Sequence, residues 1–176
     1  MNTCVYLVKL GELTLKGANI RLFEKALQAN IKSYLRKTEA KVSLYANRMY
    51  IEAPESFSAQ IEYALKHVIG IAGWAKADIC EKNIESIKKA VYKKALEAKQ
   101  NGAASFKLEA RRSDKQFPLN SYEICREGAS DVYDENLLKV DVHNPDATIY
   151  IEVRDRCFVY ANPHKANRGL PVGTGG

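Results

Sequence analysis

Hydrophobic residues in the first part of the chain follow two different periods, which predict alternating strands and helices. A nearly continuous apolar segment, residues 5–10, predicts a buried strand that ends at Gly11. Residues 19–37 carry apolar side chains at every third or fourth position, which predicts an amphipathic helix of about five turns. Two further strands, residues 42–46 and 49–53, are expected to be joined by a hairpin at Asn47-Arg48. A second helix, residues 56–70, is capped by Ser56 and ends at Gly70, and a fourth strand follows at residues 74–80.

The order of these elements is β-α-β-β-α-β, the ferredoxin-like arrangement. It is complete by residue 80, so we assign residues 1–80 to an N-terminal ferredoxin-like domain.

The second half of the chain predicts a separate α/β domain over residues 81–164. Asn83 caps a helix that runs to Gln100 and ends at Asn101-Gly102. Further along we expect a strand starting at Phe106, a helix, a short strand around Val140 and a final hairpin: residues 106–110, 120–133, 148–153 and 157–160. Residues 165–176 are rich in Pro and Gly and suit a linker. The fold class is therefore α+β.

The stretch Phe106–Ser121 turns abruptly basic where its strand ends. Arg111, Arg112 and Lys115 lie within five positions, and Asn120 with Glu123 forms a capping box that opens the next helix. A helix N-terminus offers free N–H groups and partial positive charge, and guanidinium groups bind phosphate in a bidentate way. An ordinary solvated strand end is the alternative, but the pattern favours a phosphate-binding patch.

Charge supports an anionic partner, since the net charge of +6 is distributed in patches. Residues 1–53 carry 9 basic and 4 acidic side chains, whereas residues 118–153 carry 2 basic and 8 acidic ones. No apolar run approaches the roughly 20 residues that span a bilayer, so no membrane association is expected. The four cysteines are widely spaced, which argues against a zinc site and suits reduced thiols in the cytoplasm.

Catalytic and metal-binding motifs are absent from the sequence. It has neither a G-x-x-x-x-G-K-[ST] nor a G-x-G-x-x-G loop, and its three histidines are isolated, so we expect no catalytic and no metal-ligating residue. An RNA-recognition-motif strand is also missing, which makes base stacking less favoured than contacts with backbone and shape. Basic residues in a glycine-containing loop and in the tail complete the predicted RNA-binding set: Lys16, Arg21, Arg111, Arg112, Lys115, Lys165 and Arg168.

Three groups of residues resemble motifs of one family. Gly11-Glu12-Leu13-x-Leu15-Lys16-Gly17, followed by Arg21 and Phe23-Glu24, is similar to the N-terminal motif of the tRNA 4-thiouridine synthetases, the ThiI family. Arg111-Arg112-x-Asp114-Lys115-x-Phe117-Pro118-x-x-Ser121 and Asn144-Pro145-Asp146 resemble that family's THUMP domain. Gly169-Leu170-Pro171-Val172-Gly173-Thr174 resembles the linker before its ATP-pyrophosphatase domain.

This resemblance implies a ferredoxin-like domain and a THUMP domain that together bind the acceptor stem and 3′ end of tRNA. The complete enzyme would convert the uridine at the eighth tRNA position to 4-thiouridine, with ATP and Mg as cofactors and a persulfide as sulfur source. A cysteine desulfurase would be its protein partner, and the family also serves thiamine thiazole synthesis. The sequence holds no S-G-G-x-D-S loop, so we expect these residues to bind tRNA, need no cofactor and catalyse nothing.

Two other interpretations remain open at this point. The chain could be a non-catalytic THUMP adaptor that delivers tRNA to a separate modifying enzyme. Alternatively, its ferredoxin-like half could mainly form a homodimer or bind a protein partner.

Overall fold

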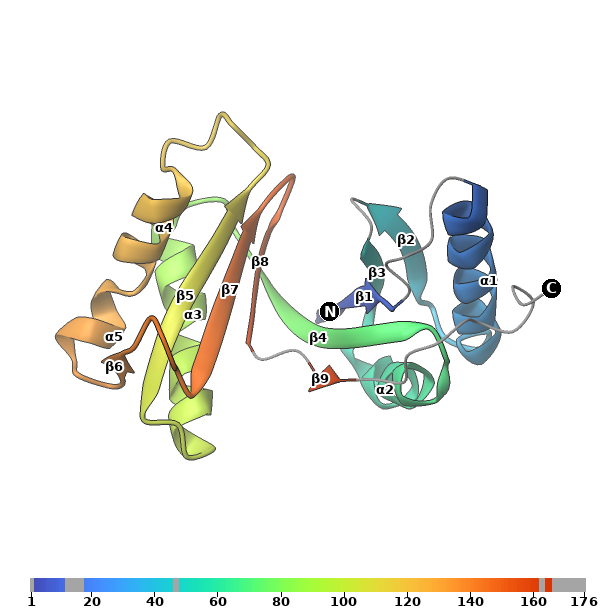
Figure 1. Cartoon of the computed structure of the whole chain (residues 1–176), viewed down its shortest axis with the longest axis horizontal. Coiled ribbons are helices and arrows are strands. Elements are labelled where there is room, and N and C mark those ends of the chain that lie inside the picture. Colours follow the sequence, from blue (N-terminus) through green and yellow to red (C-terminus); the bar gives the residue numbers. More distant parts are fainter. Residues whose placement is uncertain (1, 12–17, 46–47, 162–163, 166–176) are drawn as a thin grey trace. The chain divides into compact units, whose positions relative to one another are not determined.

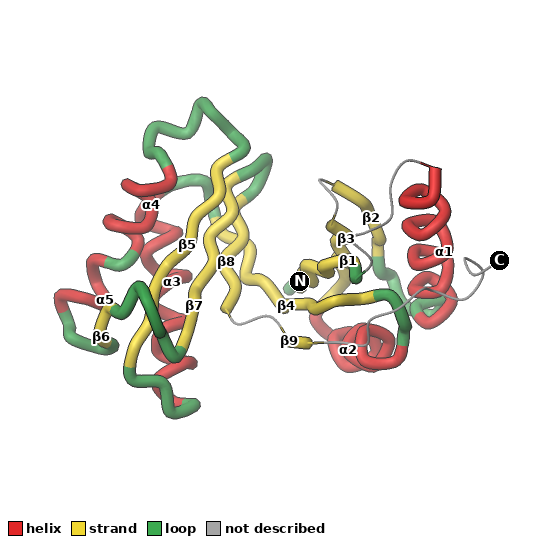
Figure 2. The backbone as a smooth tube through the Cα atoms, viewed as in Figure 1, coloured by secondary structure: helices red, strands yellow, loops and turns green. Residues whose placement is uncertain are grey.

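The computed structural model describes residues 2–11, 18–45, 48–161 and 164–165. These residues group into two compact units, and the boundary between the units falls at Lys76 and Ala77 inside a single strand, β4 (Ile71–Cys80). In each unit the helices lie on one face of a sheet (Figure 1 and Figure 2).

The first unit has the ferredoxin-like arrangement that the sequence predicts. Its sheet has the strand order β2-β3-β1-β4, and a short strand, β9, pairs with β4. The bounds of its elements are β1 (Thr3–Leu10), α1 (Ala18–Tyr34), β2 (Lys41–Tyr45), β3 (Arg48–Pro54), a 3-10 turn (Glu55–Phe57), α2 (Ser58–His67), the first part of β4, and β9 (His164–Lys165).

The apolar stripe of α1 forms the core of this unit, as its period predicts. Phe23, Leu27 and Ile31 are buried at successive turns and pack in one cluster with Tyr6 of β1 and Ile51 of β3. Burial of side chains of this size stabilises a fold by about 1.5–3 kcal/mol each.

Three local predictions about the helices of the first unit are wrong. Helix α1 ends at Tyr34 and not at residue 37, because Thr38 closes a turn in which both its N–H and its hydroxyl donate to the carbonyl of Leu35. Ser56 lies in the 3-10 turn and does not cap α2, which begins without a side-chain cap. Gly70 is not the C-cap, since α2 ends at His67 and its C-cap is Val68, whose backbone is extended.

The second unit is the predicted α/β domain. Its sheet has the order β4-β8-β7-β5-β6, in which β5 runs parallel to both β7 and β6, while β8 runs antiparallel to its two neighbours. The bounds of its elements are the last part of β4, α3 (Ile84–Gln100), β5 (Ser105–Arg112), α4 (Ser121–Gly128), α5 (Ser130–Asp134), β6 (Lys139–Val140), β7 (Ala147–Val153) and β8 (Cys157–Ala161).

The predicted helix caps of the second unit are confirmed. The side chain of Asn83 accepts a hydrogen bond from the N–H of Ser86, and Asn120 forms a reciprocal capping box with Glu123. Helix α3 stops at Asn101, followed by a glycine with a φ of 97° that a residue with a side chain rarely adopts.

Two elements of this unit differ from the prediction. The expected helix over 120–133 is divided at Ala129, whose ψ of −6° departs from helical geometry. Strand β5 continues beyond Ala110, so that Arg111 and Arg112 belong to the strand itself and not to a turn after it.

Lys165, the first residue of the expected linker, forms the short strand β9 together with His164, the last residue assigned to the second domain; the two residues pair with Gly73 and Trp74 of β4. Residues 166–176 lie outside the described part.

A close backbone approach in the first unit explains one glycine. The N–H of Gly11 donates to the carbonyl oxygen of Gly70 over 2.8 Å, and a Cβ at position 11 would lie 2.9 Å from that oxygen. Gly70 itself has a φ of 110°. Gly11 therefore allows the end of β1 to pack closely against the turn that precedes β4.

We expect Gly11→Ala to destabilise the first unit by about 1–3 kcal/mol, because a backbone oxygen cannot move away from the new methyl group as a side chain can. Urea denaturation followed by the fluorescence of Trp74, which is buried in this unit, measures the loss. The matched control is Gly128→Ala, followed by circular dichroism, since a Cβ there meets only side-chain atoms at 3.5 Å or more in a helix. A control as destabilised as Gly11→Ala would contradict the explanation.

Candidate nucleic-acid interface

The candidate interface is built by three loops at one end of the second unit's sheet. Because β5 and β7 are parallel, both strands end at the same edge, where Arg112 lies opposite Val153. The segment after β5 stays attached there, since the N–H of Ser113 donates to the carbonyl of Val153 over 2.9 Å. The turn between β7 and β8 is therefore the neighbour of the loop between β5 and α4 (Figure 1).

The third loop connects β4 to α3, and an ion pair links it to the loop between β5 and α4. Lys82 Nζ donates to a carboxylate oxygen of Asp114. The end of β5 and the three loops together carry six cationic side chains, which we call the basic edge: Lys82, Arg111, Arg112, Lys115, Arg154 and Arg156.

Arg112 has a structural role within the basic edge. Its Nη1 donates to the carbonyl of Phe117 over 2.9 Å and to that of Lys115 over 3.3 Å, so the guanidinium holds the loop after β5 in place. Phe117 is buried in the core of the unit, which anchors the loop at its other end. That Arg112 also binds phosphate stays a prediction, but the arginine already serves the protein itself.

Arg111 and Lys115 are the cations best placed for a ligand. Both are exposed, and within the described part of the chain neither side chain has a hydrogen-bond or ion-pair partner. Successive residues of a strand point to opposite faces, so Arg111 points away from the face on which Arg112 contacts the loop.

Asp114 compensates part of the positive charge. The hydrogen bond from Lys82, and a second one from the backbone N–H of Gln116, hold the pKa of the Asp114 carboxyl below its ordinary value. The carboxylate therefore stays ionised over the neutral range and pairs with Lys82. Within the described part of the chain this leaves Arg111, at the end of β5, and Lys115, in the loop, without an acidic partner.

The hairpin between β7 and β8 adds two arginines that the sequence analysis did not select. The guanidinium carbon of Arg154 lies 5.8 Å from the centre of the Phe158 ring, and that of Arg156 lies 5.3 Å from it. Phe158 is buried, so the ring fixes both side chains at the edge. No local pattern in the sequence could have found them, because the parallel pairing of β5 with β7 is what places the turn 154–156 beside the end of β5.

The N-terminus of α4 offers less than the sequence predicts. Within its capping box, Asn120 Oδ1 accepts from the N–H of Glu123 over 2.8 Å, and Glu123 Oε1 accepts from the N–H of Asn120 over 3.1 Å. Two of the N–H groups at this helix start are thus bound by the chain itself.

The predicted cations of the first unit are only partly described. Arg21 is exposed in the first turns of α1. Lys165 lies in β9, opposite Gly73. Lys16 and Arg168 lie outside the described residues. Since the two units are each described by themselves, the prediction that these cations act together with the basic edge stays a prediction.

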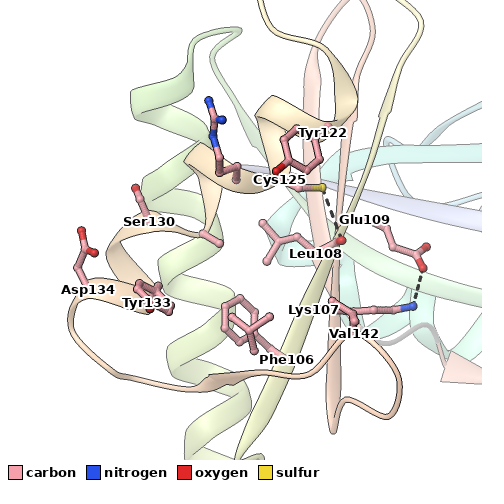
Figure 3. Close-up of a pocket in the computed structure, with 13 residues that line it drawn as sticks. Phe106, Lys107, Leu108, Glu109, Tyr122, Cys125, Ser130, Tyr133, Asp134 and Val142 are labelled. Atoms are coloured by element: carbon pink, nitrogen blue, oxygen red, sulfur yellow. Dashed lines mark hydrogen bonds and ion pairs between the residues drawn. The ribbon is translucent and has the colours of Figure 1, made fainter.

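A pocket of about 640 Å³ lies beside β5, between this strand and helices α4 and α5 (Figure 3). Its lining is mainly apolar, and its charged residues are of both signs. Lys107 pairs with Glu109 over 2.9 Å, and the other two charged residues are Arg126 and Asp134. Cys125 Sγ donates to the carbonyl of Leu108 over 3.6 Å. This balance of charge does not favour a phosphate backbone, so the pocket is distinct from the basic edge.

Two other kinds of site do not occur in the described part of the chain. None of the groups of histidine, cysteine and acidic residues there could hold a metal ion. None of its helices is both long and apolar enough to cross a membrane.

Comparison with family models identifies the class of both units. The model of the ThiI ferredoxin-like domain matches residues 5–75, and that of the THUMP domain matches residues 81–162. The two matches cover most of the chain, in the order in which the structure places the two units.

Curated relatives resemble the chain along nearly all of its length. A probable tRNA sulfurtransferase of Treponema pallidum (strain Nichols) is 42% identical over 174 residues, which are 97% of this chain and 43% of the relative. A probable tRNA sulfurtransferase of Caldanaerobacter subterraneus subsp. tengcongensis is 40% identical over 98% of this chain and 45% of the relative. The chain thus spans less than half the length of these relatives.

Two solved structures have folds that closely resemble the fold of this chain. The crystal structure of a 4-thiouridine synthetase–RNA complex with bound ATP has a TM-score of 0.83 and 31% identity, covering 99% of this chain and 45% of that one. The structure of PH1313 from Pyrococcus horikoshii Ot3 has a TM-score of 0.82 and 28% identity, covering 97% of this chain and 58% of that one.

The chain is thus a ferredoxin-like domain followed by a THUMP domain. With its sulfurtransferase relatives and its match to a 4-thiouridine synthetase, it belongs to the ThiI family.

The two neighbouring arginines of β5 should respond differently to substitution. We expect Arg112→Ala to lower the free energy of unfolding by about 1.5–3 kcal/mol, because the carbonyls of Lys115 and Phe117 lose a charged donor. Arg111→Ala removes the same charge from an exposed position and should change stability by less than about 0.5 kcal/mol. Urea denaturation of both variants measures the difference, and equal losses would contradict the structural role of Arg112.

Proposed function

We propose that this chain is the tRNA-binding part of a tRNA sulfurtransferase, which makes 4-thiouridine at the eighth position of tRNA. The observation that carries the proposal is the basic edge, where exposed Arg111 and Lys115 stand beside Arg154 and Arg156. The 4-thiouridine synthetase with 31% identity was crystallised as a complex with RNA, which agrees with this proposal.

The chemistry of the basic edge suits phosphates of a folded RNA. Guanidinium groups donate paired hydrogen bonds to phosphate oxygens, and such contacts fix the position of RNA without selecting its sequence. Phe158, the ring against which Arg154 and Arg156 lie, is buried and cannot stack on a base. We therefore propose that the chain recognises the A-form shape of the acceptor stem near its 3′ end.

We also propose that cations of the first unit bind the RNA. Lys16, Arg21, Lys165 and Arg168 would contact further phosphates of the same RNA. Arg21 is exposed, which such a contact needs. Since a longer surface neutralises more phosphates, both units would contribute to the salt dependence of binding.

The chemical step is proposed for the complete protein. ATP and Mg would activate the uridine there, and a persulfide supplied by a cysteine desulfurase would replace its oxygen. The same sulfur delivery would serve thiamine thiazole synthesis. A substrate of this kind implies a location in the cytoplasm, and formation of a homodimer remains part of the proposal.

We expect Arg111→Ala and Lys115→Ala each to reduce the salt dependence of tRNA binding. Each phosphate that is no longer neutralised should lower the slope of log affinity against log salt by about 0.7–0.9, with a similar effect for different tRNA sequences. Fluorescence anisotropy at several salt concentrations measures the slope. Lys99→Ala is the matched control, because the substitution removes the same charge from an exposed position. Lys99 lies in the last turn of α3, whereas the basic edge lies at the start of that helix.

An unchanged slope in both variants would contradict the assignment of the basic edge. A slope reduced equally by Lys99→Ala would show that net charge alone, and not this surface, determines binding.

A minimal acceptor-stem hairpin should bind more tightly than single-stranded RNA of equal length. The physical reason is that a rigid row of guanidinium groups matches the fixed phosphate spacing of an A-form helix, whereas a flexible strand must first be ordered. Competition of both RNAs against labelled tRNA provides the measurement. Equal affinities would exclude recognition by shape.

A further inference from the structure

Two cysteines that are distant in the sequence face each other across the sheet of the second unit. Cys80 is the last residue of β4, Cys157 is the first residue of β8, and the two are direct partners in the antiparallel register. Both contact the same apolar core, Cys157 as a buried member and Cys80 as a partly buried one. Their side chains therefore lie on the same face of the sheet.

The separation of such partners fits a disulfide. Directly opposite residues of antiparallel strands have Cα atoms about 4.5–5.5 Å apart, which lies within the range of about 4.4–6.8 Å found for disulfides. The thiols are close enough to shift each other's pKa, that of Cys80 upward and that of Cys157 downward.

The remaining two cysteines lack this arrangement. Cys4 belongs to the first unit, where its thiol donates to the carbonyl of Pro54 over 3.9 Å. Cys125 lies in α4, and its thiol donates to the carbonyl of Leu108. Both thiols are thus bound to backbone oxygens and are built into other parts of the fold.

We propose that Cys80 and Cys157 form an oxidation site, at which exchange with a low-molecular-weight disulfide such as oxidised glutathione produces a reversible intramolecular disulfide. The proposal rests on the register of β4 and β8 and is independent of the proposed function.

The exchange proceeds in two balanced steps. The thiolate of Cys80, the more accessible partner, attacks one sulfur of the external disulfide and releases one thiol, which leaves a mixed disulfide on Cys80. The thiolate of Cys157 then attacks Cys80 Sγ and releases the second thiol. Two protein thiols and one external disulfide thus become one protein disulfide and two external thiols.

Electrostatics assigns different parts to the two sulfurs. In the reduced chain the thiol of Cys80 and the nearby Lys82 both lower the pKa of Cys157. Once Cys80 carries the mixed disulfide it has no S–H to donate, and it is Lys82 that still favours the Cys157 thiolate as the nucleophile of the second step. The interaction with Cys157 and burial raise the pKa of Cys80, so the first step, which needs the Cys80 thiolate, accelerates as pH rises.

The bond would form beneath the basic edge. One row across the sheet contains Cys80, Cys157, Val153 and Arg112 as successive register partners. Cys80 precedes Lys82 by two positions and Cys157 follows Arg156 directly. The disulfide would join the strands that carry two of the three loops.

Thiol counting on the folded, reduced chain tests the proposal. Incubation with excess oxidised glutathione at mildly alkaline pH should leave two of the four thiols, without a glutathione adduct. Non-reducing peptide mapping should link Cys80 to Cys157, and dithiothreitol should restore all four thiols. Cys4→Ala and Cys125→Ala are the matched controls and should each still lose two thiols.

The order of the steps has its own test. In Cys157→Ala, whose small apolar side chain suits the core, glutathione should remain attached to Cys80, whereas Cys80→Ser should give neither the disulfide nor an adduct at Cys157. Four results on the unmodified chain would each overturn the proposal. Two of them are the retention of all four thiols and a lasting glutathione adduct on Cys80. The other two are a disulfide through Cys4 or Cys125 and a Cys80–Cys157 disulfide that forms only in urea. Because these outcomes are read on the unmodified chain, they hold even where a variant fails to fold.

Discussion

The parallel pairing of β5 with β7 is the constraint on which the rest of the second unit depends. Seven consecutive register pairs, from Phe106 with Ala147 to Arg112 with Val153, bring the carboxyl ends of both strands to one edge of the sheet. The loop after β5 and the turn after β7 then become neighbours, although some 40 residues separate them in the chain. The functional proposal rests on that meeting of loops.

Crowding of cations at such an edge is unfavourable unless they are compensated, and the structure provides specific partners. Asp114 accepts from Lys82, backbone carbonyls accept from Arg112, and the ring of Phe158 lies beneath Arg154 and Arg156. What these partners leave exposed is the charge of Arg111 and Lys115. The edge is therefore held in shape by some of its cations and presents others, a division that gives a preformed surface for a polyanion.

The same row of the sheet that ends in Arg112 also contains Cys80 and Cys157. The proposed RNA surface and the proposed oxidation site are thus two consequences of one set of strand registers. The two sites need different features. The surface needs exposed charge at the loops, whereas the disulfide needs two thiols on the buried face of the sheet, at the strand ends that adjoin these loops.

Local pattern in the sequence determined most of the elements. The period of the apolar residues in α1, the cap at Asn83 and the capping box at Asn120 are interactions between residues close in the chain, so they could be predicted. The family motifs extended this to both domains and their order. Arg111, Arg112 and Lys115 were selected because they are adjacent in sequence. Tertiary structure decided what depends on strand register: that Arg112 holds the loop, that Arg154 and Arg156 join the edge, and that Cys80 meets Cys157. Register is set by packing of the whole sheet, and no local pattern contains it.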